Sequence, residues 1–268
     1  MSDICLEFQN LTLGYQGHAA VHHLTGTVEC GSLTAIVGAN GSGKSTLMKG
    51  IAGILKPISG GCASKFKRLA YLPQQSELDR SFPARVVDLV ALGFLQDRGL
   101  LGRVTEDDKA KLAACLEAVG LSGFEKRSLD SLSGGQMQRA LFARTMLQDA
   151  DLILLDEPFT AVDERTIRDL VLLVRQWAAE GRTVLCVLHD HVLVRAHFPQ
   201  TLLIARKLVG WGPTPEILTP DKLLRARNFQ EAWDETAGWC AESPVALHHT
   251  HGRGGGHDGE TQRTVARV

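Results

Sequence analysis

The stretch Leu33–Thr46, LTAIVGANGSGKST, carries five mostly apolar residues directly into a glycine-rich turn. Leu33–Val37 has the composition of a buried strand, and Ser45–Leu55 that of a helix, which Pro57 and the glycines at 60 and 61 would end. The turn between them satisfies the phosphate-loop pattern Gly-x4-Gly-Lys-Ser. A chance glycine turn is the alternative, but the strand before it and the helix after it are the context that the pattern requires.

Such a loop binds phosphate because glycines let successive backbone N–H groups surround it, while the helix N-terminus adds positive potential. We expect the Lys44 ammonium to reach the β- and γ-phosphates and the Ser45 hydroxyl to ligate Mg²⁺. The residues expected to bind nucleotide are Gly38, Asn40, Gly41, Ser42, Gly43, Lys44, Ser45 and Thr46.

Two acids follow another apolar run. Leu152–Leu155 reads as a strand buried on both faces of a parallel sheet, and Asp156 and Glu157 come directly after it. Carboxylates there would lie at the sheet edge where α/β proteins bind ligands. We expect Asp156 to hold Mg²⁺ and Glu157 to polarise the attacking water. A solvated acidic turn is the alternative if the run is considered alone.

Composition excludes several classes. With 29 Lys and Arg against 30 Asp and Glu in 268 residues, the net charge is −1, so a generic surface for neutralising nucleic-acid phosphates is disfavoured. No apolar run approaches the roughly 18–20 residues of a membrane helix, and the N-terminus has no signal-peptide pattern. Six cysteines without a CxxC pair favour reduced thiols over a disulfide framework.

The order of elements predicts an α/β core with a helical insertion. Strand patterns at Ile4–Leu13 and Leu69–Leu72 precede a helical region at about 84–150, within which Thr105–Val119 is the clearest helix. After Leu152–Leu155, a helical stripe from Ile167 to Trp177 leads to a buried strand at Val184–Leu188. Residues 241–268 lose this periodicity and read as a flexible, His- and Gly-rich tail.

A third motif, Ser133-Gly134-Gly135-Gln136, opens a helix and would alone be read as a cap and turn. Together with the phosphate loop and the two acids about twenty residues later, it closely resembles the ATP-binding-cassette (ABC) ATPases. The resemblance spans Ile4 to Trp233 and implies a P-loop (RecA-like) core with a parallel sheet, a small antiparallel β lobe and an inserted α-helical subdomain. It implies an ATPase domain at 1–240, with the helical subdomain at about 84–150.

The same resemblance implies further site residues. Tyr15 matches the aromatic residue that stacks on adenine, and Gln74 the glutamine that senses Mg²⁺ and the γ-phosphate. Asp163 matches the loop that crosses the dimer interface, and His189 the histidine that contacts the γ-phosphate. Alone, Tyr15 and His189 would be ordinary structural residues. The chain has Val162 where the family more often has leucine, and Gly61–Leu69 is short for the family's small β lobe.

The segment Gln75–Pro83, with an acid-containing turn followed by Phe-Pro, resembles the ABC subgroup that serves zinc and manganese importers. It implies Mg²⁺-dependent ATP hydrolysis that drives uptake of zinc, or next manganese, on the cytoplasmic side of a prokaryotic inner membrane. The implied partners are a second copy, separate polytopic permease subunits and, indirectly, an extracytoplasmic solute-binding protein, with no nucleic acid. A haem or iron-chelate importer, a non-transport ABC ATPase and a regulatory protein with a vestigial cassette are the alternatives.

The tail offers imidazole ligands suited to Zn²⁺. A weakly binding, solvated segment is the alternative, since ligand spacing without a scaffold specifies no geometry. The candidate ligands are His248, His249, His251 and His257.

Overall fold

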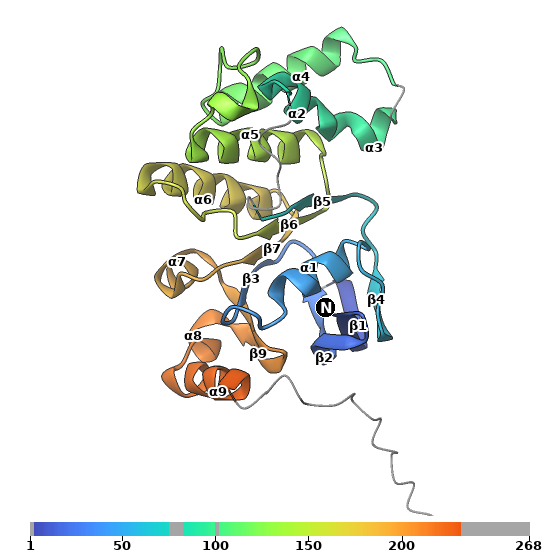
Figure 1. Ribbon diagram of the computed structural model, residues 1–268, viewed down its shortest axis with the longest axis vertical. Coiled ribbons are helices and arrows are strands. Elements are labelled where there is room, and N and C mark those ends of the chain that lie inside the picture. The colour runs from blue at the N-terminus through green and yellow to red at the C-terminus, as the bar shows by residue number, and fades with distance from the viewer. Residues whose placement is uncertain (1–2, 75–82, 100–101, 232–268) are drawn as a thin grey trace, which may run out of the picture. The chain divides into compact units, whose positions relative to one another are not determined.

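The computed structural model describes residues 3–74, 83–99 and 102–231, and these contain two β-sheets (Figure 1). The larger sheet has the strand order β5-β6-β7-β3-β8-β9, and the smaller has the order β2-β1-β4. The strands are β1 (Ile4–Tyr15), β2 (His18–Glu29), β3 (Leu33–Val37), β4 (Ser59–Ser64), β5 (Leu69–Leu72), β6 (Leu152–Asp156), β7 (Thr183–Val187), β8 (Gln200–Ala205) and β9 (Lys207–Pro213).

The larger sheet is parallel from β5 to β8, and only β9 runs antiparallel to its neighbour. Every residue of β3, β6 and β7 is buried. In β6 alternate residues enter different apolar clusters, Leu152 and Leu154 on one face, Ile153 and Leu155 on the other. Covering on both faces explains the continuous apolar runs in the sequence and confirms the parallel α/β core.

The smaller sheet is antiparallel, and β1 is its central strand. Strand β2 is not apparent in the sequence, because His18–Glu29 alternates imperfectly, and its pairing with β1 contains several register shifts. The short region after Gly60 still supplies β4, in which Ser64 pairs with Leu6. The antiparallel β lobe expected from the family resemblance is therefore present.

Helices follow the phosphate loop, fill the region between β5 and β6, and alternate with the later strands (Figure 1). Those between β5 and β6 connect two strands that pair in parallel, as expected of an inserted subdomain. The helices are α1 (Lys44–Ile51), α2 (Val86–Ala91), η2 (Leu92–Phe94), α3 (Leu95–Arg98), α4 (Glu106–Ala118), η3 (Leu129–Ser131), α5 (Gly134–Leu147), α6 (Glu164–Ala179), α7 (His191–His197), α8 (Thr214–Ile217) and α9 (Pro220–Glu231).

Side-chain caps define several helix starts. Thr105 and Asp108 form reciprocal bonds at the start of α4, and Ser133 and Gln136 do the same at α5. The helix after the phosphate loop is shorter than predicted, because α1 ends at Ile51 and turns back through Gly53, whose φ is +72°. Among the described residues no helix has both the length and the apolar character of a membrane span.

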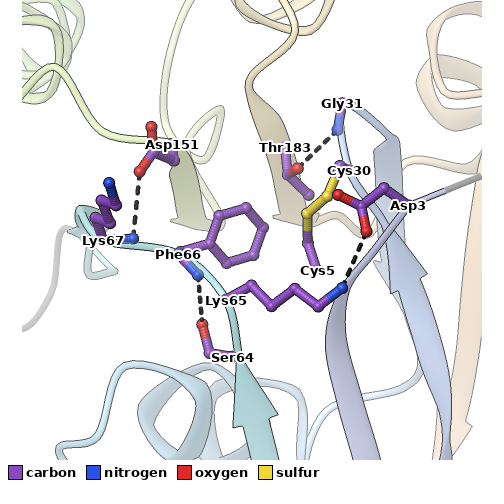
Figure 2. The surroundings of a disulfide bond; sticks show 10 residues. All are labelled: Asp3, Cys5, Cys30, Gly31, Ser64, Lys65, Phe66, Lys67, Asp151 and Thr183. Carbon is purple, nitrogen blue, oxygen red and sulfur yellow. Dashed lines mark hydrogen bonds and ion pairs between the residues drawn. A yellow bond between two sulfur atoms is a disulfide. The ribbon is translucent and has the colours of Figure 1, made fainter.

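A disulfide between Cys5 and Cys30 corrects the expectation that all cysteines are reduced (Figure 2). The two residues are 25 apart in sequence, but antiparallel pairing of β1 with β2 brings their Cα atoms to 5.1 Å. The prediction failed because β2 had not been recognised. Cys62, Cys115 and Cys186 are free thiols, as expected.

The disulfide region has other attachments besides the sulfur–sulfur bond. The Cys30 backbone N–H donates to the Asp3 carbonyl at 2.8 Å, and the Asp3 carboxylate pairs with Lys65 at 3.0 Å. The Gly31 backbone N–H donates to the Thr183 hydroxyl on β7 at 2.8 Å, which ties this corner to the parallel sheet (Figure 2). The fold at this corner therefore does not depend on the disulfide alone.

Reduction of the disulfide is expected to lower stability without unfolding the chain. Closing a loop of this length restricts the unfolded state, which in the chain-entropy account is worth about 3 kcal/mol. Thermal unfolding of the native chain with and without a reductant measures the effect. The variant Cys5→Ser should melt at the lower temperature in both conditions, whereas Cys62→Ser should behave like the native chain. An unchanged melting temperature on reduction would contradict the prediction.

Candidate functional site

The glycine-rich loop joins the end of β3 to the start of α1, and its backbone tolerates no other side chains at key positions. A Cβ on Gly38 would lie 2.2 Å from the Ile204 carbonyl oxygen. Gly43 has a φ of +96°, and a Cβ there would lie 2.4 Å from the Ala20 carbonyl oxygen. Gly43 also caps α1 without a side-chain bond, and the first turn of α1 contains no acid. The loop and helix end thus suit an anionic group.

Lys44 lies beneath this loop. Its ammonium donates to the carbonyl oxygens of Gly38 at 2.9 Å and Ala39 at 2.8 Å, and the side chain is almost fully buried. Burial lowers the pKa of the Lys44 ammonium, while the nearby carboxylates of Glu157 and Asp156 act in the opposite direction. The positive charge is therefore held between the loop and the two acids at the end of β6.

The two acids occupy different environments. Asp156 is the last residue of β6 and is completely buried, with the Tyr71 hydroxyl 3.5 Å from its Oδ2. Glu157 follows in a left-handed conformation with φ of +50°, which turns the chain out of the sheet. A non-glycine residue held there must be fixed by its surroundings.

Three side chains fix the Glu157 carboxylate, two of them from distant parts of the sequence and one from three residues further along the chain. The Gln74 amide donates to Oε2 at 3.1 Å, and the Thr160 hydroxyl lies 3.4 Å from the same oxygen. His189, just beyond β7, is hydrogen-bonded through Nε2 to Oε1. Since an ionised carboxylate only accepts hydrogen bonds, Nε2 carries the proton in this contact. Glu157 is thus oriented from three sides.

These groups line one cavity of 830 Å³. It contains most of the residues that the sequence predicted for the phosphate, water and metal positions. The predicted residues in its lining are Asn40, Gly41, Gly43, Lys44, Ser45, Thr46, Gln74, Glu157 and His189. The cavity, its basic group, its hydroxyls and its adjacent carboxylates fit a nucleoside triphosphate with Mg²⁺.

Sequence reasoning missed two lining residues, Ala20 and Thr160. Ala20 lies on β2, the strand that was not identified. Thr160 carried a signal, because it stands three residues after Glu157. However, the approach of its hydroxyl to Glu157 depends on the left-handed turn, which the sequence does not reveal.

The Ser133–Gln136 segment lies outside this cavity. A Cβ on Gly134 would be 3.0 Å from the Ala161 carbonyl oxygen, and one on Gly135 would be 3.3 Å from an Asp163 carboxylate oxygen. The segment therefore packs against the 161–166 region of its own chain. Asp163 caps α6 by accepting from the Thr166 backbone and hydroxyl, and these bonds lower the pKa of its carboxyl.

Four other predicted residues do not line the cavity, and one of them is Asp156, the expected Mg²⁺ ligand, which is fully buried beside it. Gly38 and Ser42 support the loop from within, and Ser42 is fully buried. Tyr15 ends β1 beside the turn to β2, and the residue is 49% exposed. The tail histidines, His248, His249, His251 and His257, lie outside the described residues, among which no three metal-ligating side chains of the His, Cys, Asp or Glu type gather.

Comparison with known proteins shows the family of the chain. The "ABC transporter" family model matches residues 21–160. A probable metal transport system ATP-binding protein of Chlamydia pneumoniae is 40% identical over 81% of this chain and 86% of its own. A manganese transport system ATP-binding protein of Listeria monocytogenes is 38% identical, over 81% and 94%. A zinc transport system ATP-binding protein of Treponema pallidum is 35% identical, over 82% and 86%.

Solved structures have the same fold. An ABC transporter assigned to the metal-chelate type, in an inward-facing conformation, superposes with a TM-score of 0.76 at 30% identity, covering 84% of this chain and 90% of the other. An ATP-binding cassette in its ADP conformation gives 0.72 at 22% identity, over 84% and 98%, and supports the fold alone.

The phosphate loop, the paired acids and the parallel sheet define a P-loop nucleotide-hydrolysing cassette. The chain belongs to the ABC transporter family. Within such a transporter it is the ATP-hydrolysing subunit, and the family uses ATP with Mg²⁺.

Replacing Lys44 by alanine is expected to weaken nucleotide binding. The substitution removes a buried positive charge that lies between the loop and the two acids, and loss of a charged hydrogen bond costs about 1.5–3 kcal/mol, or about ten- to a hundredfold in affinity. Titration with a fluorescent ATP analogue measures this. Lys49→Ala, at the other end of α1, should keep native affinity. Native affinity in a folded Lys44→Ala variant would contradict the prediction.

Proposed function

We propose that this chain is the ATPase subunit of an importer of divalent transition-metal ions, working as a pair of identical copies on separate permease subunits. The observation that carries the catalytic part is the convergence of Gln74, Thr160 and His189 on the Glu157 carboxylate, within the cavity that the phosphate loop borders. A carboxylate oriented in this way is suited to hold and deprotonate a water molecule.

In this proposal the loop N–H groups and Lys44 bind the β- and γ-phosphates of ATP. Ser45, Asp156 and Gln74 would hold Mg²⁺, which supplies positive charge to the β- and γ-phosphate oxygens. Glu157 takes a proton as the water oxygen attacks the γ-phosphorus, and the bond to the β–γ bridging oxygen breaks to release ADP. His189 keeps Glu157 facing the γ-phosphate, and His189 also contacts the γ-phosphate.

The paired arrangement follows from the separation of Ser133–Gln136 from the cavity of the same chain. The hydroxyl and backbone donors at the start of α5 suit a phosphate, yet they pack beside Asp163 and not beside Lys44. A two-fold dimer allows each chain to present this segment to the nucleotide of the other, and satisfies both sites together. Tyr15, exposed at the end of β1, would stack on adenine.

A divalent metal ion is the proposed cargo because relatives at 35–40% identity are named for metal, manganese and zinc transport. These relatives are matched over most of their length, so the proposal concerns the whole ATPase subunit. The ion itself crosses within permease subunits, with this chain peripheral on the cytoplasmic face. Zinc, the ion expected from the sequence, and manganese are the two candidate ions.

The variant Glu157→Gln is expected to bind ATP but to hydrolyse it at least about a hundredfold more slowly, because the amide cannot accept the proton. Steady-state phosphate release measures turnover, and sedimentation with and without ATP measures pairing. This variant should dimerise when ATP is present, whereas Lys44→Ala/Glu157→Gln should stay monomeric. Glu117→Gln, on the exposed face of α4, serves as the control with native turnover. Near-native hydrolysis by Glu157→Gln would refute the catalytic role.

The cargo is tested with the permease subunits that co-purify with this chain. Reconstituted vesicles are expected to take up radioactive Zn²⁺ or Mn²⁺ when ATP is supplied on the side that carries this chain. Glu157→Gln vesicles provide the background. Uptake of haem or of an iron chelate with no divalent-ion uptake would overturn the metal assignment. Co-purification with no membrane protein would overturn the transport role.

A further inference from the structure

The exposed edge of the larger sheet is held by two side chains from the inserted helices. β5 is the edge strand, so the carbonyl groups on its outer side meet no neighbouring strand. Gln96 of α3 donates through Nε2 to the Leu69 carbonyl at 2.8 Å. Arg144 of α5 donates through Nη2 to the Tyr71 carbonyl at 3.2 Å. Residues two apart in a strand point their carbonyls the same way, so both bonds fasten one edge.

Arg144 is partly withdrawn from water in this place. Burial lowers the pKa of its guanidinium, which shows how far the charge is removed from water. Its Nε atom is buried and meets no acceptor in the part of the chain that the structure describes. A partly buried charge contributes little to stability, and an apolar side chain of similar size is often at least as stable. Arg144 is therefore a candidate for a role other than stability.

The stretch of chain whose carbonyl group Arg144 contacts also carries two side chains that reach the acids of the site. The hydroxyl of the same residue, Tyr71, lies 3.5 Å from Asp156 Oδ2. Two residues beyond the end of β5, Gln74 donates to Glu157. One short stretch, Tyr71–Gln74, thus has Arg144 on its outer side and both carboxylates on its inner side.

Arg144 also belongs to the helix that begins at the Ser133–Gln136 segment. It lies in the last turn of α5, whose first residue is Gly134. The helix therefore ends at a bond to the stretch that orients Asp156 and Glu157.

We propose that Arg144 is a positioning residue, which makes the placement of Gln74 and Tyr71 against the two carboxylates depend on the position of α5. This inference rests on the proposed role of Glu157 in hydrolysis. Movement of α5 would reach the hydrolytic centre through the Tyr71 carbonyl.

The test is Arg144→Met, which keeps the length and apolar stem of the side chain and removes the donors. Turnover should fall about tenfold while KM for ATP stays within about twofold, since the phosphate loop is untouched. The melting temperature should not fall, because a buried charge is removed. Arg144→Lys, which keeps one donor, should recover most of the turnover. Amide hydrogen exchange at Tyr71–Gln74 should quicken in Arg144→Met but not in Arg144→Lys.

Gln96→Leu is the matched control, because it removes the neighbouring bond on the same edge without touching Tyr71. It should keep native turnover. Native turnover in a folded Arg144→Met variant would overturn the inference, as would an equal loss in Gln96→Leu. If Arg144→Met does not fold, Tyr71→Phe is the second test, because it removes the hydroxyl that lies near Asp156. Native turnover in Tyr71→Phe would also overturn the inference.

Glu157→Gln is assayed in parallel to keep the two proposals apart. If it hydrolyses ATP at the native rate, the role of Glu157 fails, whatever the Arg144 variants do. If it is inactive while Arg144→Met is native, only the role of Arg144 fails.

Discussion

Parallel pairing of β5, β6, β7 and β3 brings the main groups of the hydrolytic site to one edge of the sheet. β3 ends at Val37 and β6 begins only at Leu152, yet these strands end at one edge of the sheet. Lys44 follows β3, Glu157 follows β6 and His189 follows β7, so their side chains meet only because the register of these strands is fixed. Burial on both faces fixes it, since a shift of one residue would exchange the two apolar clusters.

Much of this arrangement could be predicted from local sequence. The phosphate loop carries its own signal, because strand, glycines, lysine and helix are contiguous in Leu33–Thr46. The run Leu152–Leu155 likewise identifies a doubly covered strand, and the acids follow from its end. The spacing of Thr105 and Asp108 alone predicts the helix cap that they form. In each case the physical cause lies within about ten residues of chain.

The rest depends on contacts between distant segments, which residue patterns do not encode. β2 is irregular because its bulges match β1, so neither the strand nor the Cys5–Cys30 disulfide could be identified. The approach of Thr160 to Glu157 follows from a backbone conformation at Glu157 that glycine would more ordinarily adopt. The roles of Tyr15 and Ser133–Gln136 rest on family resemblance, since one chain does not bring them into the cavity.

Helix α5 has a mechanical consequence that arises from its length. At 1.5 Å per residue, the axis from Arg144 to Ser133 spans about 16 Å. A tilt of about 10° around the Arg144 end would displace the Ser133 end by about 3 Å, roughly the length of one hydrogen bond. A rigid helix held near one end therefore acts as a lever, converting a displacement too small to disturb the sheet into the gain or loss of a contact at its far tip.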